Sequence, residues 1–122
     1  MIFIQILVET MRNFAYLIGD ERTGLAAVVD PAGAVERILG LARDHGLKII
    51  YIINTHSHSD HVAGSQELAS ATGSRIVMHK KARATKHLSV EDGDVISVGE
   101  FRIKVIYTPG HSPDGISLLV ED

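Results

Sequence analysis

One segment of this chain decides its fold, the run KIIYIINTHSHSDH at residues 48–61. The segment opens with Lys48–Ile53, an almost continuous apolar run that predicts a central strand buried on both faces. Three histidines and one aspartate follow at once, within Thr55–His61. In open α/β sheets, ligand sites form at the carboxyl ends of strands. The segment therefore predicts an α/β fold with a polar site at one edge of its sheet.

The residues before this segment predict more strands and one helix. Short β-rich runs separated by turn residues predict strands at Ile2–Val8, Asn13–Gly19 and Leu25–Asp30. Apolar residues at helical spacing predict a helix over Val35–Ala42, with Gly46 placed to end it. Strand, helix and strand in this order give a βαβ unit with a parallel pair.

The residues after the segment extend the same pattern. We expect a mixed β-sheet with helices on one face, to which Phe101–Tyr107 adds apolar side chains because its residues alternate. The further elements that we expect are a helix over Val62–Ala71, an irregular polar stretch over Lys80–Glu91, and strands at Arg75–Met78, Val95–Val98 and Ile116–Val120.

Composition limits the possible partners and metal ligands. The 122 residues predict a single domain, and a formal net charge of -3 without a basic block disfavours nucleic acid. The apolar start Met1–Val8 is too short for a membrane helix and has no basic leader. Because the chain has no cysteine, a metal would need imidazole and carboxylate ligands; this composition also fits a cytoplasmic protein.

The spacing of the histidines indicates a metal site. In an extended stretch, residues i and i+2 project to the same side, so His56 and His58 can converge on one ion. Asp60 and His61 lie where the chain turns into the next helix, from which they can reach a second, adjacent position. Imidazole and carboxylate suit Zn²⁺, Fe²⁺ and Mn²⁺. An alternative role for Asp60 is to cap the helix at Val62.

Three stretches, Thr55–His61, Thr108–Ser112 and Val29–Pro31, resemble motifs of a known family, the metallo-β-lactamase superfamily. Thr55–His61 resembles its T-H-x-H-x-D-H signature, and Thr108–Ser112 resembles its T-P-G-H-[ST] loop. Val29–Pro31 is similar to its strand-end motif, which carries a structural aspartate. The resemblance is closest to the glyoxalase II and persulfide dioxygenase branches.

The resemblance implies a role for each of these residues. His56, His58 and His111 would bind a first Zn²⁺, and Asp60 and His61 would contribute to a second site. A metal-bound water or hydroxide would be the nucleophile, and Asp60 would orient it. Asp30 would form hydrogen bonds near the metal loop; the alternative is a turn residue before Pro31.

Three other histidines belong to no motif. His45 falls in the last turn of the first predicted helix, where its expected role is to interact with the helix dipole. His79 and His87 are expected to be surface or packing residues.

The resemblance leaves three functions open. The first is hydrolysis of a thioester or related ester, as in a hydroxyacylglutathione hydrolase. The second is a persulfide dioxygenase-like iron enzyme, in which His56 and His111 would join a carboxylate. The third is a catalytically silent metal-binding half-domain that assembles with a partner.

The fold implied by the resemblance is an αββα sandwich about twice as long as this chain. Residues 1–122 are therefore interpreted as a metallo-β-lactamase-like domain that lacks its C-terminal half, with a bridging aspartate and a final histidine still to be supplied. We accordingly expect weak or absent turnover. We also expect a bare inner sheet face, covered by a second copy in a homodimer or by a C-terminal fragment.

Overall fold

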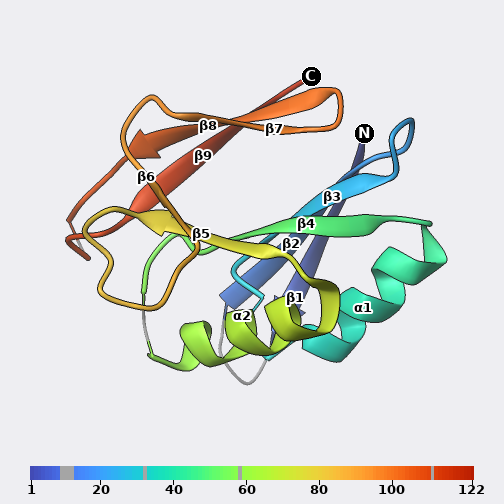
Figure 1. Cartoon of the computed structure of the whole chain (residues 1–122), viewed down its shortest axis with the longest axis horizontal. Helices are drawn as coiled ribbons and strands as arrows, with labels where there is room; N and C mark the ends of the chain where they lie inside the picture. Colours follow the sequence, from blue (N-terminus) through green and yellow to red (C-terminus); the bar gives the residue numbers. More distant parts are fainter. Residues whose placement is uncertain (9–12, 32, 58, 111) are drawn as a thin grey trace.

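The computed structural model describes residues 1–8, 13–31, 33–57, 59–110 and 112–122, and for residues 59–63 it describes the backbone alone. In these residues the chain forms two helices and two sheets, stacked as helices, first sheet and second sheet (Figure 1). The elements are β1 (Ile2–Val8), β2 (Asn13–Asp20), β3 (Leu25–Val29), α1 (Val35–Asp44), β4 (Lys48–Ile53), α2 (Ser59–Thr72), β5 (Arg75–His79), β6 (Leu88–Val90), β7 (Val95–Val98), β8 (Phe101–Tyr107) and β9 (Ile116–Glu121).

The first sheet is mixed, and its six strands lie in the order β1-β2-β3-β4-β5-β6. The pairs from β1 to β3 are antiparallel, and the pairs from β3 to β6 are parallel. Both helices lie on one face of this sheet (Figure 1). The predicted βαβ unit is confirmed as β3-α1-β4, and so is the predicted mixed sheet with helices on one face.

The helices cover the first sheet through one apolar core. Helix α1 buries Val35, Ile38 and Ala42, which fall on one face because they are spaced by three and four residues. Within the part of the chain that the structure describes, neither helix is long and apolar enough to cross a bilayer. The largest side chains that are almost fully buried in this core are Ile6, Leu17, Val28, Ile38, Ile52, Leu68, Ile76 and Met78.

The second sheet is antiparallel, has the order β7-β8-β9, and packs on the face of the first sheet that the helices leave open. Along β8, Phe101, Ile103 and Val105 are buried whereas Arg102 and Lys104 are exposed, as their alternation predicts. Their partners in this second core come from β2, β3, β4, β5 and β6, and include Ile18, Ala27, Val29, Ile53 and Val77.

Four sequence-based expectations are wrong. Phe101–Tyr107 does not join the sheet of Lys48–Ile53; it forms the middle of the second sheet because β7 and β9 pair with it on either side. The stretch Lys80–Glu91 is not wholly irregular, since β6 pairs in parallel with β5. Helix α2 begins at Ser59, three residues before the predicted Val62. The inner face of the first sheet, which was expected to be bare, is covered at its centre by β7–β9.

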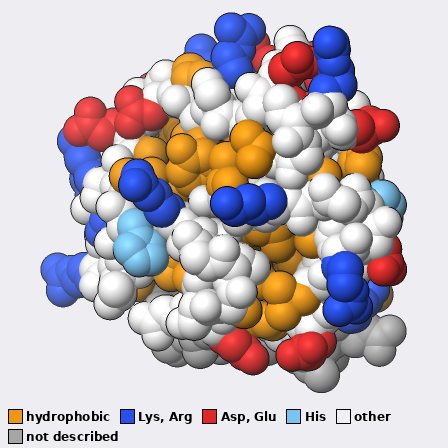
Figure 2. Space-filling view, turned by 45° about the vertical axis from the view of Figure 1, so that its right-hand side comes forward, with side chains coloured by type: hydrophobic (Ala, Val, Ile, Leu, Met, Phe, Trp, Pro, Cys, Tyr) orange, Lys and Arg blue, Asp and Glu red, His pale blue; other side chains and the backbone are white. Residues whose placement is uncertain are grey.

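Part of that inner face remains open near β1 and β2. Phe3, Leu7 and Phe14 are each about half exposed, at 55%, 46% and 45%. A groove of ≈ 300 Å³ runs between these strands and β9, and is lined by Phe3, Tyr16 and Leu118 among others. The space-filling view also shows hydrophobic side chains at the surface between charged ones (Figure 2). The homodimer stays a prediction. The apolar surface that it would bury is smaller than a wholly bare sheet face, because β7–β9 already cover part of that face.

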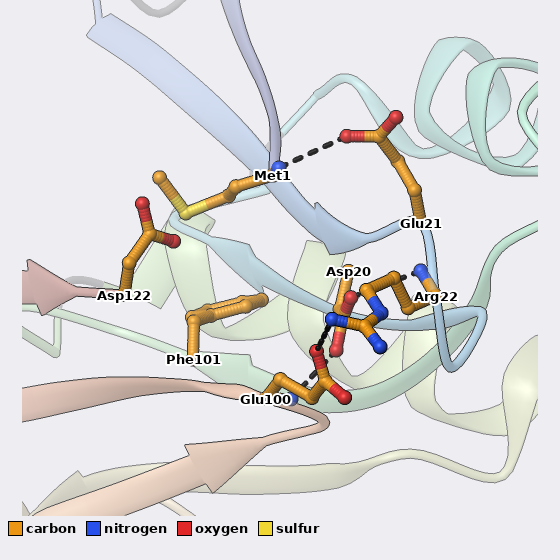
Figure 3. A pocket seen from close by; sticks show the side chains of 7 residues that line it. All are labelled: Met1, Asp20, Glu21, Arg22, Glu100, Phe101 and Asp122. Carbon is orange, nitrogen blue, oxygen red and sulfur yellow. Dashed lines mark hydrogen bonds and ion pairs between the residues drawn. The ribbon is translucent and has the colours of Figure 1, made fainter.

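The two sheets are joined by a buried carboxylate at the end of the molecule where the chain termini lie (Figure 1). Asp20, at the end of β2, accepts hydrogen bonds from the Glu100 N–H at 2.6 Å, the Arg22 N–H at 3.0 Å and the Thr23 hydroxyl at 3.0 Å. Figure 3 shows Asp20 between the β2–β3 and β7–β8 turns, in the lining of a cavity of ≈ 410 Å³. The bond from Glu100 holds the pKa of Asp20 below its ordinary value.

We predict that Gly99→Ala destabilises the protein. Gly99 has φ +58, and an added Cβ would overlap the Asp20 carboxylate and the Thr23 hydroxyl. The matched control is Gly93→Ala, where φ is +86 and nothing lies within 4 Å of the added carbon. Backbone strain of this kind costs about 1–3 kcal/mol, so both variants should unfold at lower urea, and Gly99→Ala at the lowest. Equal urea midpoints for the two variants would show that contact with Asp20 is unimportant.

Candidate metal centre

The candidate site lies where two loops meet. Residues 54–57 leave the carboxyl end of β4 and lead into α2, and residues 108–115 connect β8 to β9. The Ile116 N–H donates to the Thr55 carbonyl at 2.9 Å, which joins the two loops through their backbones. The loop that carries His56 is thus held beside the loop that contains His111 in the sequence.

A hydrogen-bonded chain orients His56. Asp30 accepts the Thr55 N–H at 2.9 Å through Oδ1 and the Thr55 hydroxyl at 2.6 Å through Oδ2. Thr55 Oγ1 also lies 3.0 Å from His56 Nδ1. Because the only hydroxyl hydrogen of Thr55 goes to Asp30, Oγ1 accepts at this contact and His56 Nδ1 donates. A neutral His56 therefore has its lone pair on Nε2, as a metal ligand requires.

Asp30 has the position that the resemblance implies. It is buried at 8% exposure and directly follows β3, the strand that pairs in parallel with β4. Its φ of 49 is left-handed, which is uncommon for a residue other than glycine. The Asp30 N–H donates to the Ile53 carbonyl at 3.0 Å, so this backbone is fixed against the end of β4. The prediction that Asp30 forms hydrogen bonds near the metal loop is confirmed.

A second buried carboxylate holds the other side of this loop. Asp114 is 4% exposed, and its Oδ2 accepts both the N–H of Ser57, at 3.0 Å, and the Ser57 hydroxyl. Its Oδ1 accepts the Ser112 hydroxyl. Burial alone would raise the pKa of Asp114, but the hydrogen bonds from Ser112 and Ser57 outweigh burial and lower it. Sequence reasoning missed this residue, although its place three positions after His111 was a signal.

Asn54 links the same loop to α2 and β5. It is 1% exposed, and its Oδ1 accepts the Ser65 hydroxyl of α2 at 2.8 Å. Its backbone N–H donates to the Val77 carbonyl of β5 at 3.0 Å. The start of the loop is therefore rigid on both sides.

The structure describes only part of the predicted ligand set. His56 is partly exposed at the start of the loop, whereas His58 and His111 lie outside the described residues. Asp60 and His61 belong to α2, but their side chains are also outside the description. Since the helix begins before it, Asp60 does not hold the cap position expected at Val62. Among the residues that are described, no three His, Asp or Glu side chains are grouped to hold an ion, so the ligand set stays a prediction.

His79 packs beside this site, as expected for a packing residue. It is 2% exposed, and its ring stacks on Tyr107 with centroids 4.2 Å apart and planes 8° apart. Its Nδ1 accepts the Lys81 N–H at 3.1 Å, and the Tyr107 hydroxyl donates to the Pro113 carbonyl at 2.6 Å. Burial and the nearby charges of Lys81 and Lys80 lower the pKa of His79.

The two remaining histidines also have local roles. His87 Nδ1 accepts the Ile76 N–H at 2.8 Å. His45 Nδ1 lies 2.9 Å from the Leu41 carbonyl in the last turn of α1. His45 thus lies at the helix end, as expected, and His87 packs against the backbone of β5.

Comparison with known proteins identifies relatives of this fold and site. The family model described as "Metallo-beta-lactamase superfamily" matches residues 10–122. Persulfide dioxygenase ETHE1 of Homo sapiens is 35% identical over 112 residues, and hydroxyacylglutathione hydrolase of Rhodopseudomonas palustris is 40% identical over 113 residues. Each alignment covers 90% of this chain but 44% of the relative, so the chain spans less than half the length of either relative.

A solved structure agrees with this picture. The crystal structure of ETHE1 from Myxococcus xanthus superposes with a TM-score of 0.92 at 34% sequence identity. The superposition covers 98% of this chain and 54% of that one.

We predict that the buried His79 makes stability depend on pH. Because the folded pKa is lowered, the unfolded chain binds this proton at higher pH than the folded chain does. Its contribution is complete above the ordinary histidine pKa of about 6.5 and is lost as pH falls through the lower folded value. The urea midpoint should drop between about pH 7.5 and about pH 5, and His79→Phe should reduce that drop. An identical drop in the variant would contradict the prediction.

We predict that Thr55→Val, which keeps the side-chain shape, changes the tautomer of His56. Without the hydroxyl, the contact between Thr55 and His56 Nδ1 is lost, and the proton should move toward Nε2. Imidazole ¹⁵N shifts of the metal-free protein measure this directly, and affinity for Zn²⁺ should fall by about 10- to 100-fold. Thr85→Val, at an exposed threonine of the β5–β6 loop, is the control and should change neither quantity.

Proposed function

The chain belongs to the metallo-beta-lactamase superfamily, and from that premise we propose that it carries the first metal site of a metal-dependent hydrolase. In this proposal His56, His58 and His111 hold one ion. The observation that carries the proposal is the Asp30–Thr55–His56 chain of hydrogen bonds, which directs the lone pair of His56 to Nε2. Such a bond to the other ring nitrogen is the usual companion of a ligating histidine.

The residues present fit a metal with nitrogen and oxygen ligands. The chain offers imidazole and carboxylate and has no thiolate, a set that favours Zn²⁺ and also suits Fe²⁺ or Mn²⁺. A bound Zn²⁺ supplies water of pKa about 7 and polarisation of a carbonyl. We assign Asp60 and His61 to a second ion, and Asp60 also to orienting the attacking water.

Thioester hydrolysis is the reaction that we propose for this site. It is supported by 40% identity to hydroxyacylglutathione hydrolase over 113 residues. The chain's own contribution to the reaction is positional. Asp30 holds Thr55, and Asp114 holds Ser57. Because these are the two neighbours of His56, that histidine is held in place before substrate arrives. Positioning of this kind lowers the reorganisation needed during reaction.

Persulfide oxidation by an iron enzyme is the second candidate. It is favoured by the similarity to two ETHE1 proteins, one of which superposes with a TM-score of 0.92. His56 and His111 would supply the two imidazoles of a two-histidine, one-carboxylate iron site. The metal that supports activity separates the two candidates.

We predict that the chain binds Zn²⁺ and that His56→Ala weakens this binding by more than about 100-fold. Loss of a residue that supports a ligand lowers metal affinity by about 10- to 100-fold, and loss of a ligand itself should cost more. Competition with a chromophoric chelator measures the affinity. His45→Ala, at the exposed end of α1, is the control and should bind as the parent does.

Activity of the loaded chain tests the reaction itself. Hydrolysis of a hydroxyacylglutathione with Zn²⁺, lost in His56→Ala, would support the hydrolase. Oxygen consumption with a persulfide and Fe²⁺ would instead support the second candidate. Metal binding without either activity would favour a silent metal-binding half-domain that acts by assembly.

A further inference from the structure

We infer that Asp114 is a positioning residue that sets the separation of the two histidine-bearing loops and thereby the affinity for the metal. This inference rests on the metal site proposed above. Asp114 itself is not assigned as a ligand, because both of its carboxylate oxygens already accept hydrogen bonds within the protein.

The sequence positions of its donors carry the argument. Ser57 lies between His56 and His58, and Ser112 directly follows His111. One carboxylate therefore holds the neighbour of every proposed ligand of the first site. Oδ2 holds Ser57 by its backbone N–H and its hydroxyl, and Oδ1 holds the Ser112 hydroxyl. Hydrogen bonds to an ionised acceptor are roughly twice as strong as those between neutral groups.

The loop around Asp114 is itself fixed. The Thr108 N–H donates to the Gly115 carbonyl at 3.0 Å, and the Ile116 N–H donates to the Thr55 carbonyl at 2.9 Å. The Tyr107 hydroxyl donates to the Pro113 carbonyl at 2.6 Å. Asp114 is thus held on a closed loop, and its bonds to Ser57 transmit that position to the loop that follows β4.

The charge of Asp114 adds a second effect. Among the described residues no Lys, Arg or His lies within ion-pair distance of this carboxylate, and its partners are neutral hydroxyls and one N–H. Within the described part of the chain, this buried carboxylate between the two loops is held by neutral donors alone. Such a charge favours a cation nearby, because the protein interior screens it less than water does.

Two substitutions separate geometry from charge. Asp114→Asn keeps the shape and an oxygen that can accept from Ser57, but it removes the charge. Asp114→Ala removes the charge and every hydrogen bond to the side chain. Asp44→Asn, at an exposed aspartate at the end of α1, is the control for a change of one charge on the surface.

The test is the dissociation constant for Zn²⁺, measured on the 122-residue chain by competition with a chromophoric chelator. We expect Asp114→Ala to weaken binding by about 10- to 100-fold, the range for residues that support metal ligands. Asp114→Asn should lie between that variant and the parent, and Asp44→Asn should equal the parent. The urea midpoint of each metal-free variant is measured alongside, because a purely structural residue would lower that midpoint without changing the affinity of the folded protein.

Ser112→Ala provides a milder variant should Asp114→Ala fail to fold. It removes one donor to Asp114 and should weaken Zn²⁺ binding by a smaller factor than Asp114→Ala does. Affinities unchanged from the parent in the folded variants would overturn the inference while leaving the metal site standing. A parent chain that binds no Zn²⁺ would overturn the proposed function, and this inference with it.

Discussion

Strand β4 has to be buried on both faces, and the rest of the molecule follows from that constraint. Its side chains divide between the two cores, since Ile52 packs with the helices and Ile53 packs with the second sheet. Each face of the strand therefore needs its own apolar cover. The helices provide one cover and β7–β9 provide the other (Figure 1). Stacking the second sheet there brings the β8–β9 loop to the carboxyl end of β4, where the polar segment begins.

The candidate site is built on that junction and is organised by two buried carboxylates. Asp30 comes from the end of β3 and holds Thr55, whereas Asp114 comes from the β8–β9 loop and holds Ser57. His56 lies between Thr55 and Ser57. Its two neighbours are therefore held by one carboxylate that follows a strand of the first sheet and one that lies between two strands of the second. A rigid loop of this kind is what a metal site needs, because ligands placed in advance lose little freedom when they bind.

Local sequence patterns predict much of this architecture. Lys48–Ile53 is a strand with the predicted bounds, α1 follows the predicted helical spacing, and Asp30 contacts the segment that its motif implies. The predictions that failed concern features that depend on contacts between residues far apart in the sequence. The three-residue β6 is too short to give a periodic signal. The sheet to which Phe101–Tyr107 belongs depends on its pairing with β7 and β9, which alternation alone does not encode. Asp114 was missed because its partner Ser57 is 57 positions away.

The contacts that close the site also fix the order in which it can be assembled. Asp20 and Glu100 are joined across 80 positions of the chain, and Ser57 and Asp114 across 57. Pairings this distant close long loops, and the entropic cost of closing them comes before the contacts that offset it. During synthesis the segment with His56 leaves the ribosome well before the segment with His111, since chains emerge from their N-terminus. The proposed ion needs both loops, so it would bind tightly only once β9 has docked, and it would then stabilise the folded state relative to the unfolded one.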